Sequence, residues 1–315
     1  MARTAAHSSP GRPGHCRLRP HSTPARVPDL TTARIEPADR TLQVNGITLH
    51  YLDWGPEGLP PLILLHGISL HAHYWDGFAV RMRDAFHVYA LDQRGHGDSD
   101  WAESYPPDSM PKDLLAFADA LGLEKLTIVG HSMGGGVGMQ FAAHHPERVE
   151  RLVVVDAGLS LSAMPRPDNS VQRALAKDTF ANEDELIEHF KGLLPGFDPA
   201  TMMRQAMHSF RTQEDGSIVY KFDPALRKRM GSPEQMEQRR KTNAETMALL
   251  RKFTAPTLLI RGALSDILSP EGARETIAAF PNGTLVEIPD AGHNVPTDNR
   301  VAFRTAVREW MGLEA

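Results

Sequence analysis

One serine of this sequence is flanked by glycines in a way that is typical of a catalytic nucleophile. Ser132 lies in the stretch GHSMGGG at 130–136, directly after an apolar run at 126–129. Where a strand turns sharply into a helix, the residue at the tip is exposed, and glycines are needed beside it because a Cβ atom would collide as the two elements close on each other. The pattern predicts an exposed Ser132 at such a turn, with a helix N-terminus pointing at whatever the serine binds.

A serine hydroxyl is a weak nucleophile at neutral pH, so it needs a general base within hydrogen-bond reach and an acid that orients this base. His293, in the stretch AGHN, is the candidate base, and Asp266, in GALSD, is the candidate acid. Asp290 is an alternative acid, since it lies only three residues before His293. These residues follow predicted strands, and the carboxyl ends of parallel strands meet at one edge of a sheet, where ligands bind.

Two backbone N–H groups are candidates for the oxyanion hole that an acyl-transfer intermediate needs. The N–H of Met133 lies at the start of the predicted helix, and the N–H of Ile68 follows His66 and Gly67. Gly67 lets this second loop approach the nucleophile closely. Removing one oxyanion donor typically raises the barrier by about 2.7–4 kcal/mol, so we expect both groups to matter for catalysis.

Other histidines have simpler structural interpretations. We expect His131 to pack behind the turn, His96 to form hydrogen bonds within a Gly-His-Gly turn, and His66 to shape its loop. His71 and His73 resemble a metal-binding pair, but a third ligand at a recognisable spacing is missing. A polar helix start near the mouth of the pocket is therefore expected at these two residues.

The stretch DQRGHGDS follows another predicted strand. It contains Asp92 and Arg94, which are expected to form a structural ion pair beneath the site. Neither a P-loop nor a dinucleotide-binding fingerprint is present in the sequence. The sequence therefore predicts neither a cofactor nor a bound metal.

The elements that would position these residues alternate between strands and helices. Helical patterns occur at 72–84, 111–121, 271–280 and 297–312. Such alternation is typical of a parallel sheet with right-handed crossovers, and Asn45-Gly46 is a hairpin signal. The predicted fold class is α/β, with a mostly parallel eight-stranded sheet flanked by helices. Its strands are expected at 41–45, 47–53, 62–65, 87–91, 126–129, 151–155, 257–261 and 284–288.

The alternation breaks between 159 and 253, where the pattern of buried strands is lost. We expect a mainly helical cap at 159–253, inserted into a core at 40–158 and 254–315, after a disordered Pro/Arg-rich tail at 1–39. Methionines of this region pack helices together or wall a partly apolar pocket. They are Met202, Met203, Met207, Met230, Met236 and Met247. The cap is expected to contain helices at 182–194, 199–212 and 233–253, and a hairpin that turns at 214–216.

Composition limits the classes of function. The chain has 315 residues, a net charge of −5, 41% hydrophobic and 23% charged residues, and a single cysteine, Cys16. Blocks of one charge and long apolar runs are missing, which argues against nucleic-acid binding and membrane association. One cysteine cannot form an intrachain disulfide, so a reducing, cytoplasmic location is expected. The expected partner is a small-molecule substrate that is partly apolar, and the oligomeric state stays open.

Together these motifs resemble the α/β-hydrolase superfamily, in the branch with a helical cap and a Ser-His-Asp triad. The resemblance implies a triad of Ser132, Asp266 and His293 that works without a cofactor. It also makes Asp156 an alternative acid, since some relatives carry the acid after the corresponding strand. The matching stretches, which span 41–313, are HG at 66–67, DQRGHGDS at 92–99, GHSMGG at 130–135, HPERV at 145–149, GALSD at 262–266 and GH at 292–293.

The same resemblance narrows the chemistry. Related epoxide hydrolases and haloalkane dehalogenases carry an aspartate nucleophile where this chain has Ser132, so both activities are disfavoured. The resemblance implies hydrolysis of a carboxylic ester-type substrate, including lactones or thioesters, through an acyl-enzyme intermediate. Alternatives are C–C bond hydrolysis of ring-cleavage products, cofactor-free haloperoxidase or perhydrolase activity, and, outside enzymes, a small-molecule receptor that retains the triad. Cap residues that select the substrate follow no readable code, so the sequence leaves these alternatives open.

Overall fold

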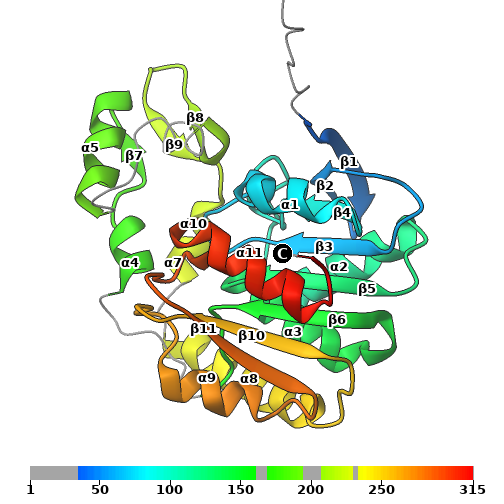
Figure 1. Cartoon of the computed structure of the whole chain (residues 1–315). Coiled ribbons are helices and arrows are strands. Elements are labelled where there is room, and N and C mark those ends of the chain that lie inside the picture. Colours follow the sequence, from blue (N-terminus) through cyan, green and yellow to red (C-terminus); the bar gives the residue numbers. More distant parts are fainter. Residues whose placement is uncertain (1–34, 161–168, 194–206, 230–232, 315) are drawn as a thin grey trace, which may run out of the picture. The chain divides into compact units, whose positions relative to one another are not determined.

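The computed structural model describes residues 35–160, 169–193, 207–229 and 233–314. Its central feature is an eight-stranded sheet with the order β1-β2-β4-β3-β5-β6-β10-β11 (Figure 1). β1 pairs antiparallel with β2 and β2 with β4, whereas the other neighbours are parallel. The predicted α/β fold with a mostly parallel sheet is confirmed. The strands are β1 (Ala38–Val44), β2 (Ile47–Asp53), β3 (Pro61–Leu65), β4 (His87–Leu91), β5 (Leu126–His131), β6 (Val149–Val155), β10 (Thr257–Gly262) and β11 (Gly283–Ile288).

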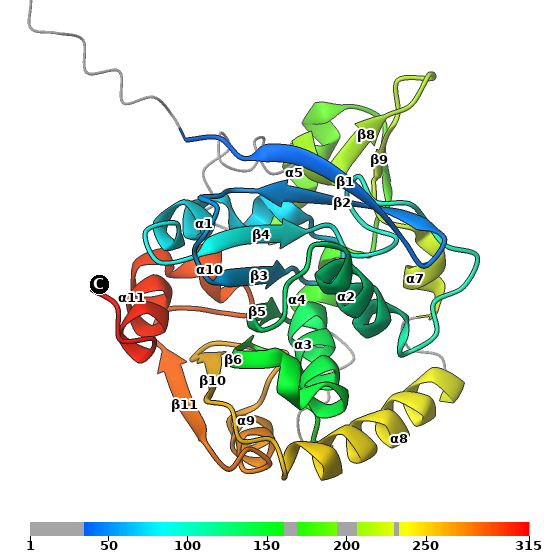
Figure 2. The same cartoon turned by 90° about the vertical axis from the view of Figure 1, so that its right-hand side faces the viewer.

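Helices cover both faces of this sheet, and each face has its own apolar cluster (Figure 2). The alternation of side chains along a strand explains the two clusters. In β3, Ile63 and Leu65 point into one cluster, whereas Leu62 and Leu64 point into the other. The first cluster is covered by α2 (Ser109–Ala120), α3 (Met133–His144), α8 (Pro233–Leu250) and α9 (Pro270–Ile277), and the second by the 3-10 helix η1 (Ala72–Trp75), α1 (Asp76–Met82) and α11 (Arg300–Trp310).

The N-terminal hairpin forms where the sequence predicts it. Asn45 and Gly46 join β1 to β2 with φ angles of 48° and 79°, which a two-residue hairpin turn requires. β1 already begins at Ala38, so the core starts slightly earlier than predicted. Residues 1–34, which make up most of the predicted tail, lie outside the described residues.

A second, smaller sheet forms within the predicted cap. Its strands β7 (Thr179–Phe180), β9 (Ile218–Tyr220) and β8 (Phe210–Thr212) pair antiparallel in that order. The hairpin that turns at 214–216 is therefore confirmed. The helix predicted over 199–212 is wrong at β8, because Phe210 pairs with Tyr220 across the hairpin and is buried there. The stretch 199–206 lies outside the described residues, and the helices described in this region are α4 (Ser170–Ala174), α5 (Glu183–Leu193) and α7 (Pro224–Arg229).

The helix α8 packs with the core, although the sequence places it in the cap. It contacts α3, beside which it runs in Figure 2. Leu250 and Phe253 at its end are buried in the apolar cluster beneath the sheet, and Asn243 Nδ2 donates a hydrogen bond to the Leu159 carbonyl at 3.1 Å. The range predicted as a cap thus extends too far at its C-terminal end, because an amphipathic helix does not reveal which surface it covers.

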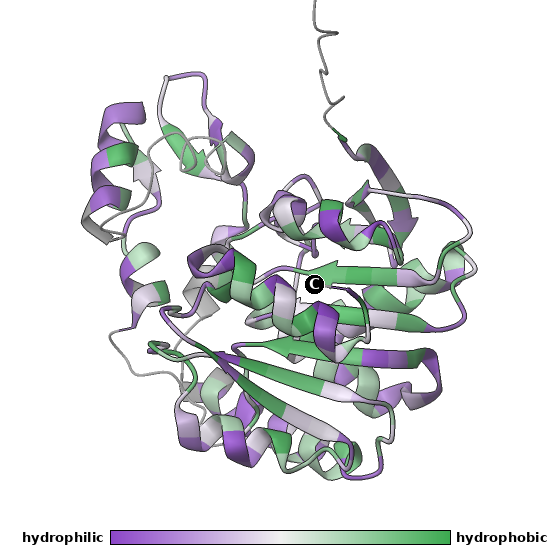
Figure 3. Cartoon of the chain, viewed as in Figure 1, coloured by the Kyte–Doolittle hydropathy of each residue, from purple (hydrophilic) through white to green (hydrophobic). Residues whose placement is uncertain are grey.

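Hydropathy follows this architecture. The strands of the large sheet are mostly apolar, while the helices carry polar residues on their outer sides (Figure 3). Within the described ranges, no helix combines the length and the apolar character that a membrane crossing requires. Most apolar side chains therefore lie between the large sheet and the helices that cover it.

Candidate active site

Ser132 occupies the sharp turn between β5 and α3. Its φ and ψ angles are 52° and −113°, a backbone conformation that residues other than glycine rarely adopt. The flanking glycines allow the turn to close: a Cβ atom on Gly130 would lie 2.3 Å from the Gly134 carbonyl oxygen, and one on Gly134 would lie 2.3 Å from the Leu65 carbonyl oxygen. The chain therefore holds the serine at a strained tip, as active sites often do.

His293 lies between Ser132 and a carboxylate. Its Nε2 atom is 3.0 Å from Ser132 Oγ, and its Nδ1 atom is 2.7 Å from Asp156 Oδ2. Both His293 and Asp156 are buried. His293 follows β11, Ser132 follows β5 and Asp156 follows β6, so the carboxyl edge of the sheet brings three distant residues together, as expected for an open α/β sheet.

Asp266, the acid predicted from the sequence, is not the hydrogen-bond partner of His293 in this structure. The loop after β10 instead reaches Asp156: Gly262 N–H donates to Asp156 Oδ1 at 2.9 Å, and the Ser265 hydroxyl donates to Asp156 Oδ2. One residue further on, Asp266 binds Ser170 of α4. The alternative acid Asp290 is exposed. A signal for Asp156 was present, since it directly follows a buried strand.

His131 supports the His293 loop from behind. Its ring stacks on Tyr74 at a centroid distance of 5.2 Å, and its Nε2 atom lies 2.9 Å from the His293 carbonyl oxygen. Burial lowers the pKa of His131 well below its usual value, so the ring is neutral. A carbonyl only accepts hydrogen bonds, so Nε2 carries the proton. His131 therefore packs behind the turn as predicted and fixes the backbone that carries His293.

The loop after β3 approaches Ser132 closely. A Cβ atom on Gly67 would lie 3.2 Å from Ser132 Cβ, and the N–H of Gly134 donates to the His66 carbonyl at 3.1 Å. His66 Nδ1 lies 2.8 Å from the Gly67 carbonyl oxygen, and its Nε2 atom accepts the Gln93 N–H at 3.0 Å. His66 thus shapes its loop, as predicted, and holds the backbone after Gly67 beside Ser132.

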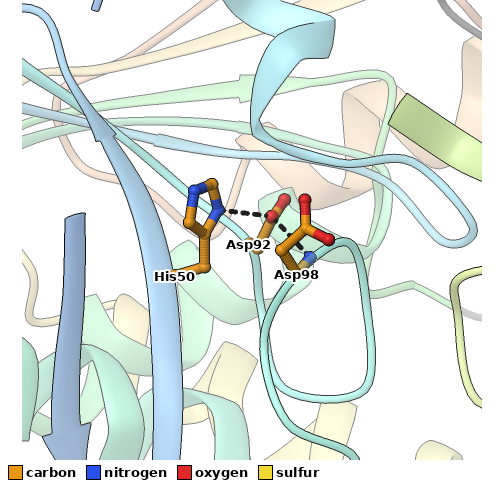
Figure 4. Close-up of side chains that lie close together, drawn as sticks. All are labelled: His50, Asp92 and Asp98. Atoms are coloured by element: carbon orange, nitrogen blue, oxygen red, sulfur yellow. Dashed lines mark hydrogen bonds and ion pairs between the residues drawn. The ribbon is translucent and has the colours of Figure 1, made fainter. Parts of the chain in front are cut away.

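The loop after β4 is organised by a carboxylate. His50 Nδ1 lies 2.7 Å from Asp92 Oδ2, which also accepts the N–H of Asp98 at 2.9 Å (Figure 4). Burial raises the pKa of Asp92, but the hydrogen bond to His50, the neighbouring rings of His66 and His50 and the Asp98 N–H together outweigh it and hold this pKa well below its usual range. The predicted Asp92–Arg94 ion pair is wrong, because Arg94 instead pairs with Asp113 of α2.

The cluster of His50, Asp92 and Asp98 has the spacing of a metal site, since its ligand atoms lie within 4.8 Å of one another. Its lone pairs are used by the protein itself. Asp92 Oδ1 accepts the Ala72 N–H at 2.6 Å, and Asp98 pairs with Lys221 Nζ at 2.8 Å. These contacts tie the loop to η1 and to β9, so we interpret the cluster as a structural clamp.

The histidine pair at 71 and 73 gains a third ring in the structure. His208, from the cap, stacks on His73 at a centroid distance of 3.7 Å and lies 5.7 Å from the His71 ring. Among the described residues, only His50, Asp92 and Asp98 have the spacing of a metal site, so these three rings do not form one. Burial lowers the pKa of His71 to about 3. The three rings form a contact between core and cap.

A pocket of about 160 Å³ opens in front of Ser132. Polar groups at the pocket include Ser170, Arg173 and Asp298, and burial raises the pKa of the Asp298 carboxyl. Of the cap methionines, Met247 packs against the core, in line with the packing alternative, Met207 and Met236 are exposed, and Met202, Met203 and Met230 lie outside the described residues. The apolar walls come instead from Val171, Leu175, Phe190, Phe210 and Tyr220.

Comparison with known proteins identifies the family of this chain. Residues 60–299 match the family model of the alpha/beta hydrolase fold. The chain belongs to the α/β-hydrolase family. It is 27% identical over 270 residues to the sn-1-specific diacylglycerol lipase ABHD11 of Mus musculus. The matched region covers 82% of this chain and 82% of the lipase. It is 26% identical to the N-formylmaleamate deformylase of Pseudomonas putida, over 87% of this chain and 96% of that protein.

A solved structure shares the fold over nearly its full length. The crystal structure of E-2-(acetamidomethylene)succinate hydrolase superposes with a TM-score of 0.72 at 22% identity, over 87% of this chain and 99% of that one. This likeness concerns the fold alone. Together with the family match and the hydrolases among the relatives, it identifies this α/β hydrolase as an enzyme.

Proposed function

We propose that this α/β hydrolase cleaves carboxylic ester-type substrates through an acyl-enzyme intermediate. The proposal rests on the chain of hydrogen bonds from Ser132 Oγ through His293 to Asp156, at 3.0 Å and 2.7 Å, beside the pocket. Asp156 replaces Asp266 as the acid. Because its carboxylate is buried and accepts hydrogen bonds from three groups, it is well placed to orient the imidazole and to stabilise its charged form.

The proposed reaction has two halves. His293 Nε2 takes the proton of Ser132 Oγ as the oxygen attacks the carbonyl carbon, and the N–H groups of Ile68 and Met133 stabilise the oxyanion. Met133 is the first residue of α3, so its N–H has no acceptor within the helix. His293 then protonates the leaving alcohol. In the second half it takes a proton from water, which attacks the acyl group, and returns this proton to Ser132 Oγ as the acid leaves.

A second candidate is hydrolysis of an amide in an acidic substrate. Two relatives are named for N-formylmaleamate and 2-(acetamidomethylene)succinate. The observation that favours this candidate here is the guanidinium of Arg173 at the pocket, which suits a carboxylate group of a substrate. Esters with and without a carboxylate on the acyl chain would separate the candidates, since only the second predicts a clear preference for the anionic compounds.

A fluorophosphonate probe tests the proposal. We expect the wild-type chain to be labelled at Ser132, and the Ser132→Ala variant to lose both labelling and hydrolysis of p-nitrophenyl esters. A folded wild-type chain that remains unlabelled would favour a small-molecule receptor with a retained triad. Hydrolysis of a ring-cleavage dienoate in preference to every ester would favour C–C bond hydrolysis. Perhydrolysis of an ester in the presence of peroxide would favour the cofactor-free haloperoxidase alternative.

We keep the cytoplasm as the proposed location. Cys16 is the only cysteine of the sequence, so the fold does not depend on an intrachain disulfide. A fusion to a redox-insensitive fluorescent protein, followed by fractionation, would test it.

A further inference from the structure

Asp266 ties the short helix α4 to the core. Its carboxylate accepts the Ser170 N–H and the Ser170 hydroxyl, each at 2.7 Å, and Arg173 Nη2 lies 3.5 Å away. Ser170 and Arg173 belong to α4, whereas Asp266 follows β10 of the large sheet. Ser170 is the first residue of α4. A carboxylate at the N-terminus of a helix accepts an N–H that has no acceptor within the helix, and the helix dipole favours the negative charge there.

The position of α4 depends on such external contacts. The helix has five residues, too few to be stable in isolation. Ser170, Val171, Arg173 and Ala174 all line the pocket in front of Ser132, so α4 is one of its walls. Any movement of α4 would change the space available to a substrate.

Other contacts hold the rest of the cap independently of α4. Lys221 Nζ pairs with Asp98 at 2.8 Å, and the Tyr105 hydroxyl donates to Asp223 Oδ2 at 2.6 Å. Both contacts connect the residues between β9 and α7 with the loop that follows β4. Loss of the Asp266 contacts is therefore expected to loosen the first turn of α4, while its end stays tied to α5 by His189 Nε2, which lies 3.2 Å from the Ala174 carbonyl oxygen.

We propose that Asp266 is a positioning residue, which fixes α4 as a wall of the pocket and thereby sets the size of the substrate group that fits against it. This inference rests on the proposed hydrolytic function, because it assigns selectivity to the same pocket. The acid loop predicted from the sequence thus serves two purposes in this chain. Ser265 supports the carboxylate of Asp156, and Asp266 secures the wall above it.

Steady-state kinetics separate positioning from catalysis. Wild type, Asp266→Ala and Asp266→Asn would be compared on two series: p-nitrophenyl esters of rising acyl length, and acetate esters of rising alcohol length. We expect Asp266→Ala to lower kcat for p-nitrophenyl acetate by at most about threefold. KM for the long members of at least one series should change about tenfold, as the loss of a charged hydrogen bond implies. Asp266→Asn keeps one acceptor and should be intermediate. The matched control is Asp290→Asn.

A double-mutant cycle then assigns the effect to the contact itself. Ser170→Ala should change KM in the same direction as Asp266→Ala, and the double variant should add little to Asp266→Ala, because that variant already removes the acceptor of the Ser170 hydroxyl. Fully additive effects, or KM values that stay at the wild-type level across both series, would overturn the proposal. A collapse of kcat for the acetate in Asp266→Ala would also overturn it, because Asp266 would then act as the catalytic acid.

Hydrogen exchange gives a readout that does not depend on turnover. The amides of 170–175 are expected to exchange about tenfold faster in Asp266→Ala than in wild type, while amides of β9 remain protected. Unchanged exchange in 170–175 would contradict the anchoring of α4. If wild type hydrolyses no substrate of either series but the exchange changes as expected, the proposed function fails while the contact between Asp266 and α4 stands.

Discussion

Replacement of Asp156 by asparagine tests the proposed triad most directly. The Gly262 N–H donates to Asp156 Oδ1 at 2.9 Å, and His293 Nδ1 faces Oδ2 at 2.7 Å. Because the Gly262 N–H can only donate, the carbonyl oxygen of an asparagine is expected to keep the Oδ1 position. Its NH₂ group then faces His293 and also can only donate. His293 Nδ1 must accept, so the imidazole proton moves to Nε2, the atom that faces Ser132.

An imidazole that already carries its proton on Nε2 cannot take one from serine. In serine proteases the corresponding change lowers kcat by about 10⁴, which is about 5.4 kcal/mol of activation free energy. We expect a loss of this size in Asp156→Asn. The fold should survive, because asparagine has nearly the same volume and keeps the hydrogen bond to Gly262.

The assay is kcat for p-nitrophenyl acetate, with circular dichroism to verify folding and Asp290→Asn as the matched control. Asp290 is exposed, and asparagine tolerates its positive φ of 53°, so this control should behave as wild type. If folded Asp156→Asn retains more than about a tenth of wild-type kcat, the tautomer argument is refuted. A loss of about 10⁴ in Asp266→Asn instead would return the role of the acid to the residue predicted from the sequence.

Three further predictions follow from the same site. Gly67→Ala places a Cβ atom 2.9 Å from His131 Nδ1, which should displace the loop after β3. With the same ester, kcat should fall about 10²-fold while KM changes less. A kcat at the wild-type level would show that the loop tolerates the added Cβ atom. Ser265→Ala removes one donor to Asp156 and should lower kcat about tenfold, and no effect would mean that the remaining donors suffice. The folded-state pKa of His71 is about 3, so its contribution to stability is full above about pH 6.5 and falls by about 1.4 kcal/mol per pH unit below it. Urea unfolding of wild type and His71→Leu between pH 7 and pH 5 should show a shallower decline for the variant, and parallel declines would contradict the assignment.

The sequence predicts the nucleophile, the base and the sheet because their signals are local. The glycines around Ser132 report a steric requirement of one turn, and the apolar runs report burial of single strands. The choice between Asp156 and Asp266 depends on which carboxylate lies within hydrogen-bond distance of His293 in the folded sheet. That distance is set by the bend of the loop after β10. The spacing GALSD permits either Ser265 or Asp266 to face the sheet edge, so the sequence alone could not decide it.

The cap shows the same limit. An amphipathic pattern predicts that α8 is helical, but it does not say whether its apolar face covers the core or the cap. The pattern of 199–212 predicts a helix over β8, because the burial of Phe210 comes from pairing with Tyr220 on a neighbouring strand and leaves no mark on the local periodicity. His208 could not be linked to His73, since the stacking joins two segments that only the folded chain brings together.

The order of the three proposed triad residues along the chain determines where segments can be lengthened or replaced without moving these residues. Ser132 and Asp156 directly follow the adjacent strands β5 and β6, both before the cap segment. After this segment, β10 pairs directly with β6, with Val155 opposite Ile260. Lengthening or replacing the intervening segment therefore leaves the register of the sheet unchanged. Because α8 lies in this segment and packs with the core, the part that can be exchanged without disturbing the helical layers is expected to end before α8.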